Sequence, residues 1–443
     1  MKKLLSGSLL LLVSFAAVSQ QAFSLEEAVA YGLKHHADVR NAIVRKQDTE
    51  LQIKEIKVAG MPQINGQFQY TYNAIVPTQL IDAQNFDPTA PEGSVTKFKF
   101  GVPWAGQAGV AINQLIFDAT WLVGLRAQDT YRKLADQELV QSKTTVAENI
   151  TKAYYSVLVA VERAKIIDLN IARLDTMEYN TTQMFNQGFV EKIDLDRIAV
   201  QKNNLKTELT KVNNLIDLSK QLLKFQMGYN VSSEIVLTDN LKDQEDKTLA
   251  TIAKQEVDPE NRIEYQVLKT NRQLLELNEE RYLKGAIPNV FFSGSLGAGH
   301  SNTRFNPFER WFGSSALSLG VNIPIFDSGL RKVQAERQRL NIIQMDNTAE
   351  MLRNSFNLQN DQATINMTNG LETLDVQKRN LELAEEVVRV SKIKYQQGVG
   401  SNLEVVNAEN DLRQAQTNYF AALYDVLVAK VDLDKAQGKL ITE

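Results

Sequence analysis

The chain has 443 residues, of which 43% are hydrophobic and 23% charged, with a formal net charge of −4 and no cysteine. This composition excludes a disordered chain, disulfides, thiolate metal sites and a lipid anchor on an N-terminal cysteine. The acidic balance and the lack of a basic patch argue against a nucleic-acid partner. The three histidines are His35, His36 and His300, so we expect no histidine-based metal site and no cofactor.

The N-terminal sequence MKKLLSGSLLLLVSFAAVS has the layout of a secretory signal peptide. Lys2 and Lys3 form the charged start, an apolar run follows, and the small residues Ala17 and Ser19 suit a cleavage site. The alternative is a membrane anchor, but the apolar run is shorter than the roughly 20 residues of a spanning helix. We therefore predict a signal peptide over 1–19 and an exported mature chain.

Further along the chain, several segments alternate apolar and polar residues over about ten positions, which predicts β-strands. Gln, Asn, Ser and Gly predominate at the polar positions. Such strands fit either one side of a soluble sheet or the wall of a membrane barrel around a water-filled lumen. Four of them in an exported chain favour the barrel. The clearest alternations set Ile64, Gly66, Phe68, Tyr70 and Tyr72 against Gln63, Asn65, Gln67, Gln69 and Thr71, and Leu317, Leu319, Val321 and Ile323 against Ala316, Ser318, Gly320 and Asn322.

We predict that these strands form two β-hairpins, over about 62–117 and 288–326, with outer loops at 74–107 and 300–312. Four strands do not close a barrel, and an open sheet edge is not tolerated in lipid. Single-chain outer-membrane barrels start at about eight strands. Several chains must therefore contribute, and three chains would supply twelve strands.

Two long stretches contain very little glycine or proline, which is typical of long helices. No proline lies between Pro103 and Pro259, and none follows Pro324. A helix of about seventy residues would be about 105 Å long, which no compact globular domain holds. We therefore predict rod-like helices over about 118–228 and 327–440, each interrupted by a glycine-containing break.

Apolar residues in the last helix recur at alternating spacings of three and four, which predicts a left-handed coiled coil. Alanine occupies every seventh position, which lets helix axes approach closely. The predicted seam comprises Val405, Ala408, Leu412, Ala415, Tyr419, Ala422, Val426, Ala429, Leu433 and Ala436, and Ile342, Met345, Ala349, Leu352 and Phe356 form a second seam.

The whole pattern occurs twice, at an offset of about 210 residues. Phe117-Asp118 corresponds to Phe326-Asp327, and Gln187-Gly188 corresponds to Gln397-Gly398. The predicted organisation is a signal peptide at 1–19, a first repeat at 20–228, a polar linker at 229–258 and a second repeat at 259–443. The fold class is mainly α, with antiparallel coiled-coil hairpins in tandem repeat and four transmembrane strands per chain.

The sequence resembles the TolC family of outer-membrane efflux proteins. The residues that carry the resemblance are Tyr395, Gly398, Ser401, Glu404, Val405, Ala408, Glu409, Leu412 and Ala415 at their spacing, together with Phe326-Asp327-x-Gly329, the tandem halves and SLEEAVAYGLKHHADVRNA from Ser24. The resemblance covers nearly all of the mature chain. It implies a homotrimer with a twelve-stranded barrel in the outer membrane of a Gram-negative bacterium and a helical tunnel in the periplasm. It also implies a periplasmic adaptor and an inner-membrane pump of the RND or ABC type.

The resemblance places the glycine-containing turns at the periplasmic tip, where the adaptor docks. These turns map to Gly188 and to Gly398, Gly400 and Ser401. Independently, the break at Gly398 predicts a left-handed conformation or a tight reversal.

In relatives, two acidic positions after the second turn form rings that narrow the tunnel and select for cations. They map here to Glu404 and to Asn407, which is not acidic. Asp194 is the counterpart of Glu404 in the first repeat. The alternative for Glu404 is a solvated helix face. Asp118 and Asp327, where strand gives way to helix, are expected to be N-caps.

No nucleophile elbow, phosphate loop or His-Glu-x-x-His motif occurs in the chain, so we expect no enzyme. The expected function is a passive exit channel of a tripartite efflux or type I secretion system, opened at its periplasmic tip by adaptor and pump. The alternatives are a periplasmic adaptor and a structural coiled-coil protein of the cell envelope.

Overall fold

The structure, a computed structural model, describes residues 21–250 and 258–440, so the predicted signal peptide lies outside the described residues. The chain divides into two compact units. The helical unit comprises Met1–Arg45, Asp136–Val267 and Ala349–Glu443, and the sheet unit comprises Lys46–Ala135 and Leu268–Thr348.

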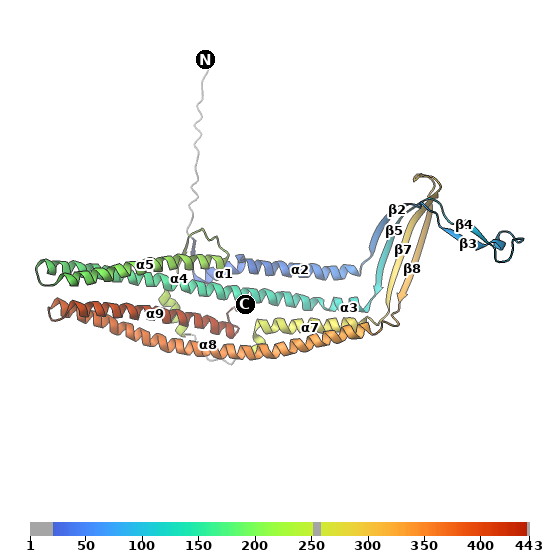
Figure 1. The fold of residues 1–443 in the computed structure, drawn as a ribbon. Helices are drawn as coiled ribbons and strands as arrows, with labels where there is room; N and C mark the ends of the chain where they lie inside the picture. The colour runs from blue at the N-terminus through green and yellow to red at the C-terminus, as the bar shows by residue number, and fades with distance from the viewer. Residues whose placement is uncertain (1–20, 251–257, 441–443) are drawn as a thin grey trace, which may run out of the picture. The chain divides into compact units, whose positions relative to one another are not determined.

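Two antiparallel helical hairpins dominate the helical unit (Figure 1). In the first, α4 (Gln128–Asn186) returns as α5 (Lys192–Met227), and in the second, α8 (Leu330–Gln396) returns as α9 (Asn402–Ala436). Residues of the first predicted seam are buried, apart from the half-buried Tyr419. The coiled-coil prediction for the last helix is therefore confirmed.

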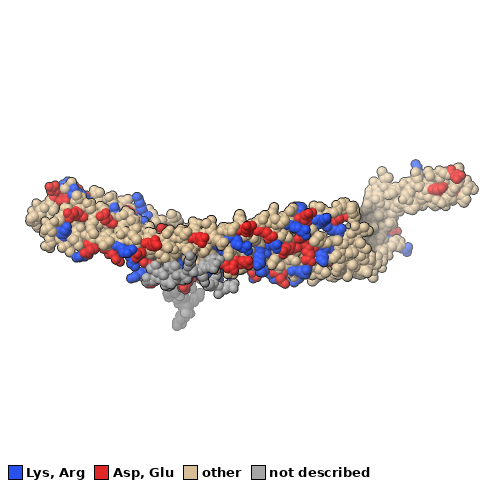
Figure 2. Space-filling view, turned by 90° about the horizontal axis from the view of Figure 1, so that it is seen from below, with Lys and Arg blue, Asp and Glu red and all other residues tan. Residues whose placement is uncertain are grey.

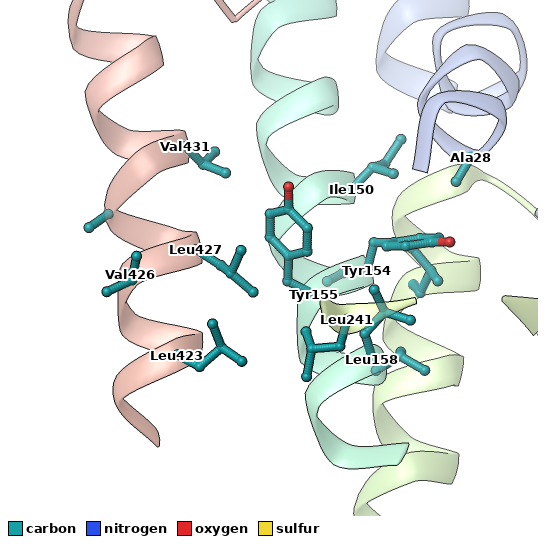
Figure 3. Packing of buried hydrophobic residues seen from close by; sticks show 14 of the residues in the cluster. Ala28, Ile150, Tyr154, Tyr155, Leu158, Leu241, Leu423, Val426, Leu427 and Val431 are labelled. Carbon is teal, nitrogen blue, oxygen red and sulfur yellow. The ribbon is translucent and has the colours of Figure 1, made fainter. Parts of the chain in front are cut away.

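The core of the helical unit gathers side chains from both hairpins and from α1 (Leu25–His35). Figure 3 shows Ile150, Tyr154 and Leu158 of α4 on one side and Leu423 and Leu427 of α9 on the other. The buried Tyr154 hydroxyl donates a hydrogen bond to the Phe23 carbonyl at 3.0 Å. A large apolar core therefore joins the two repeats.

The predicted linker at 229–258 contains short elements that belong to this core. β1 (Gln21–Phe23) pairs in parallel with β6 (Ile235–Leu237), and α6 (Leu241–Ala250) follows. Ile235 and Leu241 are both buried in the cluster. The linker thus fastens the N-terminal strand of the described chain to the hairpins.

The sheet unit holds an antiparallel four-stranded sheet in the order β2-β5-β7-β8. Its strands are β2 (Gln63–Tyr72), β5 (Trp104–Phe117), β7 (Asn289–Asn302) and β8 (Phe312–Asn322). The β5–β7 pairing joins the two repeats, and β2 and β8 are the edges. The predicted hairpins are present, and β5 and β7, with 14 residues each, are longer than expected.

The segment predicted as an outer loop at 74–107 contains a second small hairpin. β3 (Thr78–Asp82) pairs with β4 (Val95–Lys99), and a 3-10 turn (Ala83–Asn85) lies between them. Phe98 packs against Phe86 and Phe100 with ring centroids 5.7 and 4.9 Å apart. Contacts between aromatic side chains thus stabilise regular structure in a segment that was predicted to be a loop because of its prolines. The other predicted loop, 300–312, is shortened at both ends by β7 and β8.

The remaining helices lead into and out of the sheet. They are α2 (Ala37–Ala59), α3 (Ala119–Arg126) and α7 (Ile263–Lys284), with a 3-10 turn at Pro259–Asn261 before α7. Within the described residues, no helix is both long and apolar enough to cross a membrane.

Candidate functional site

The register of the sheet sorts the side chains into one apolar and one polar face. Ile64, Ile112 and Leu317 fall in one cross-strand row with Gly294, whereas Gln63, Asn113, Ser293 and Ser318 form the next row on the opposite face. The four strands contain no Asp, Glu, Lys or Arg. Figure 2 shows the charged side chains concentrated over the helices instead.

The apolar face is uncovered in the single chain. Phe68 and Leu296 are each 69% exposed, and Leu317 is 81% exposed. A contiguous apolar face of this kind marks a surface that contacts a partner or a membrane. The polar face carries amide side chains, hydroxyl side chains and glycines, and such a face suits contact with water. It also has a shallow hollow of about 270 Å³ around Gly109 and Gly297.

An aromatic cluster lies on the apolar face at the end of the sheet where β2 and β7 finish and β5 begins. Tyr70 packs with Trp104 and His300 at ring-centroid distances of 5.8 and 6.0 Å, and His300 packs with Trp311 at 5.4 Å. Gly106 makes room for it, because a Cβ there would lie 2.8 Å from the Tyr70 ring and 2.9 Å from Trp311. Aromatic residues near the ends of the strands are typical of outer-membrane barrels, where they form girdles.

The two hairpin turns have the same backbone geometry. Gly188 and Gly398 adopt left-handed φ values of 79° and 72°. Each forms a Schellman motif: the N–H of Phe189 donates to the Met184 carbonyl at 2.9 Å, and the N–H of Val399 donates to the Lys394 carbonyl at 3.0 Å. The left-handed position of this motif strongly favours glycine, which has no Cβ to cause a steric penalty there.

Gly400 and Ser401 have different roles in the second turn. A Cβ on Gly400 would lie 3.0 Å from Cβ of Lys394 and 3.1 Å from the Tyr395 nitrogen, so close packing calls for glycine there. Ser401 is the N-cap of α9, and its hydroxyl accepts a hydrogen bond from the Glu404 N–H at 3.2 Å.

Glu404 and Asn407 lie exposed near the start of α9, and Asp411 continues the same exposed face one turn further. The Glu404 carboxylate has no ion-pair partner among the described residues. Asp194 differs from Glu404, because its carboxylate is 19% exposed and lies 3.4 Å from Arg197. The structure therefore brings Glu404 and Asn407 onto one face and leaves Asp194 on α5 with a cation beside it.

Comparison with known proteins agrees with this geometry. The sequence model of the family described as "Outer membrane efflux protein" matches residues 284–439. Over 452 aligned positions the chain is 21% identical to the "Outer membrane protein TolC" of Escherichia coli (strain K12), covering 99% of this chain and 87% of that protein. The chain is thus similar to TolC-family outer-membrane efflux proteins over nearly its whole length, and the family model matches most of its second repeat.

Further relatives and solved structures extend the comparison. The chain is 20% identical to the "Proteases secretion protein PrtF" of Dickeya chrysanthemi, covering 98% of this chain and 92% of that one. Among solved structures, CusC superposes with a TM-score of 0.73 at 13% identity over 94% of this chain and 92% of that one. The open state of the Neisseria gonorrhoeae MtrE channel superposes with 0.67 at 14% identity, over 94% and 88%. These structures share the fold.

Polar side chains also join the two hairpins, and the predictions from the sequence did not include them. Asn402 Nδ2 donates to the Asp194 carbonyl at 3.0 Å, Gln201 Nε2 donates to Asn410 Oδ1 at 2.7 Å, and Asn170 donates to Gln416 Oε1 at 2.7 Å. These bonds link α9 to α5 and α4. The signal was available: Asn402, Glu409 and Gln416 recur every seventh residue beside the alanine seam and are buried.

Asp118 stands where β5 gives way to α3. Its carboxylate accepts hydrogen bonds from the backbone N–H of Thr120 at 2.7 Å and of Trp121 at 3.1 Å, which makes it the N-cap of α3. Burial raises the pKa of this carboxyl, but the hydrogen bonds from Thr120 and Trp121 outweigh burial and hold it below its usual value.

Asp327 lies three residues before α8 rather than at its first turn. Its Oδ2 accepts hydrogen bonds from Nε of Arg331 at 2.6 Å and from the Arg331 N–H at 3.2 Å. These bonds lower the pKa of the Asp327 carboxyl. Ser328 and Gly329 have φ values of 56° and 80°, so Asp327 reaches the helix across a left-handed turn.

Within the described residues, no cluster of His, Cys, Asp or Glu side chains could hold a metal ion.

Proposed function

We propose that the protein is a passive exit channel in the outer membrane of a Gram-negative bacterium, serving a tripartite efflux or type I secretion system. The observation that carries this is the uncharged four-stranded sheet, with one apolar face, one polar face and two unpaired edges, in a chain that also forms long helical hairpins. Three chains joined edge to edge would give a closed barrel of twelve strands. The apolar faces would contact lipid, and the polar faces would line the lumen.

In this proposal the channel catalyses no reaction and supplies no energy for transport. TolC-family channels work as homotrimers with a periplasmic adaptor and an inner-membrane pump, of the RND or ABC type, which supplies the energy. The polar face presents hydroxyl and amide groups without fixed charge, so it would pass solutes of different chemistry. The absence of enzymatic activity is part of this proposal.

The hairpin turns are proposed as the docking site of the adaptor. Gly188, Gly398, Gly400 and Ser401 shape two turns that present apolar side chains, with Phe189 73% and Val399 77% exposed. Beside them, a groove of about 380 Å³ runs between α5 and α9, lined by Ile193, Val200 and Val406 with Arg197 and Arg413. An amphipathic helix of the adaptor would pack its apolar stripe into such a groove.

Glu404 is proposed to line the tunnel mouth as a ring of three carboxylates, one from each chain. Such a ring attracts cations. Asn407 would contribute no charge, so this mouth is expected to be less negative than one with two acidic rings. Asp194 would contribute to the tip mainly through its backbone carbonyl, which accepts the hydrogen bond from Asn402, and less through its carboxylate charge.

The proposal has a direct test in detergent and in planar bilayers. Purified protein should run as a trimer and conduct ions, whereas an adaptor or a structural coiled-coil protein should not conduct. Because the chain has no cysteine, Gln201→Cys with Asn410→Cys can be joined selectively by a short bifunctional maleimide. Cross-linking should abolish efflux, and a matched pair of cysteines within α9 should not. Efflux that survives a cross-linked tip would contradict opening at the tip.

A further inference from the structure

A cavity of about 210 Å³ lies between the first hairpin and the second in the helical unit, and it opens to solvent beside the exposed Thr176, Asn180 and Gln396. On one side α4 contributes Arg173, Met177 and Thr181 to its wall. On the other side α8 contributes Lys392 and Tyr395, and α9 contributes Val405. The volume is well above the requirement of a single water molecule, so the space is large enough for a small organic ligand.

Two hydroxyl groups that line this cavity have no hydrogen-bond partner among the described residues. They are the Oγ1 of Thr181, which is fully buried, and the phenol of Tyr395. Buried hydroxyls nearly always have a partner. On the same helix, Thr176 and Thr182 donate to the carbonyls of Ala172 and Glu178 at 3.1 and 2.7 Å.

Thr181 therefore departs from the usual habit of a helical threonine, which is to bond the carbonyl four residues earlier. Its hydroxyl and that of Tyr395 come from different hairpins and line one space. A molecule in this space could bond to both of them.

The charges and apolar groups around the cavity define the chemistry of that molecule. Arg173 and Lys392 line it, and no carboxylate of the described part of the chain does. Lys392 also lies 2.6 Å from the buried Glu409, and Arg173 contacts the Asn170 amide. Met177, Met184 and Val405 supply apolar wall, and methionine sulfur packs well against aromatic rings.

We propose that this cavity binds a small single-ring aromatic carboxylate. The ring lies against Met177 and Met184, and the carboxylate accepts hydrogen bonds from Thr181 and Tyr395 beside the two cations. Because the walls come from both hairpins, the ligand holds them in the arrangement described above. In terms of the proposed channel function, on which this second step rests, the ligand opposes opening of the tip.

Benzoate is the probe, and binding is measured on the purified trimer in detergent by saturation-transfer NMR, which does not depend on channel activity. The expected result is saturable binding that weakens at least tenfold in Thr181→Val and in Tyr395→Phe and is lost in Val405→Trp, which fills the cavity. Thr182→Val is the matched control, since its hydroxyl bonds within its own helix. Heat-resistant trimers on a gel identify the variants that still fold.

Three results would overturn the site: no saturable binding of benzoate, equal binding by all variants, or equally tight binding of the neutral analogue benzyl alcohol. The effect on opening is read separately, as a decrease in open probability with benzoate in planar bilayers. Binding without that decrease would refute the gating step alone. A trimer that binds benzoate but never conducts would instead count against the channel function.

Discussion

Replacing Asn402 by alanine tests whether polar contacts between the hairpins hold the tip together. Asn402 is 4% exposed, and its side-chain amide donates to the Asp194 carbonyl on α5 at 3.0 Å. The substitution removes this bond and leaves the seam residue Val405 in place. We expect the second hairpin to separate more readily from the first.

The size of the effect follows from the net value of one hydrogen bond. A typical bond contributes about 0.5–1.5 kcal/mol, which changes an equilibrium constant by about 2- to 13-fold at RT of about 0.59 kcal/mol. With about 1 kcal/mol per chain and three chains opening together, the open state would gain about 3 kcal/mol, or about 160-fold in population. If each chain opens independently, the gain is about 5-fold per chain.

Single-channel recording in planar bilayers measures this open probability directly. Asn418→Ala is the matched control, because Asn418 is exposed on α9 and its side chain accepts a hydrogen bond from Gln414 of the same helix. Asn402→Ala should raise the open probability well above the control, and cells that carry it should admit large antibiotics more readily. An open probability equal to that of Asn418→Ala would refute the role given to the contacts between the hairpins.

Four further predictions test other parts of the structure. Glu404→Gln should lower cation selectivity and weaken block by divalent cations, measured as reversal potential and conductance; unchanged values would remove Glu404 from the ring. Gly398→Ala should cost about 1–2 kcal/mol per chain because of its left-handed φ, visible as a lower melting temperature of the trimer. Leu317→Arg should cost about 2–4 kcal/mol if it faces lipid, and Ser318→Arg little; similar losses of folded protein would contradict the assignment of the faces. Asp327→Asn should be less stable than the natural protein at neutral pH. The lowered pKa of Asp327 means that its contribution is complete above the usual value of about 3.9 and is lost as pH falls through the lowered pKa, so the gap in melting temperature should close in acid.

The coiled-coil seams and the strands were predictable because their signals are local. Val405, Leu412 and Val426 are buried, as a repeat of three and four residues requires. The alternation in Ile64–Tyr72 likewise follows from a sheet with one apolar face. In both cases the period of the element fixes which side chains share a face.

The parts that escaped prediction depend on contacts between distant segments. Thr181 and Tyr395 lie in different repeats, and no periodicity indicates that they line one cavity. Asn402, Glu409 and Gln416 did have a seven-residue spacing, but a polar stripe is equally typical of a solvated helix face. The β3–β4 hairpin was hidden because prolines and polar residues in 74–107 are typical of a loop. Its order depends on the packing of Phe86 and Phe98.

The two unpaired edges of the sheet, β2 and β8, have a genetic consequence. Each closed barrel would need every one of its subunits to present both edges intact, so a defect in one edge is not confined to the chain that carries it. In a cell that makes damaged and intact chains in equal amounts, random assembly would leave about one eighth of the trimers fully intact. Mutations that spoil an edge without preventing assembly should therefore be dominant-negative, whereas mutations that prevent the chain from folding at all should be recessive.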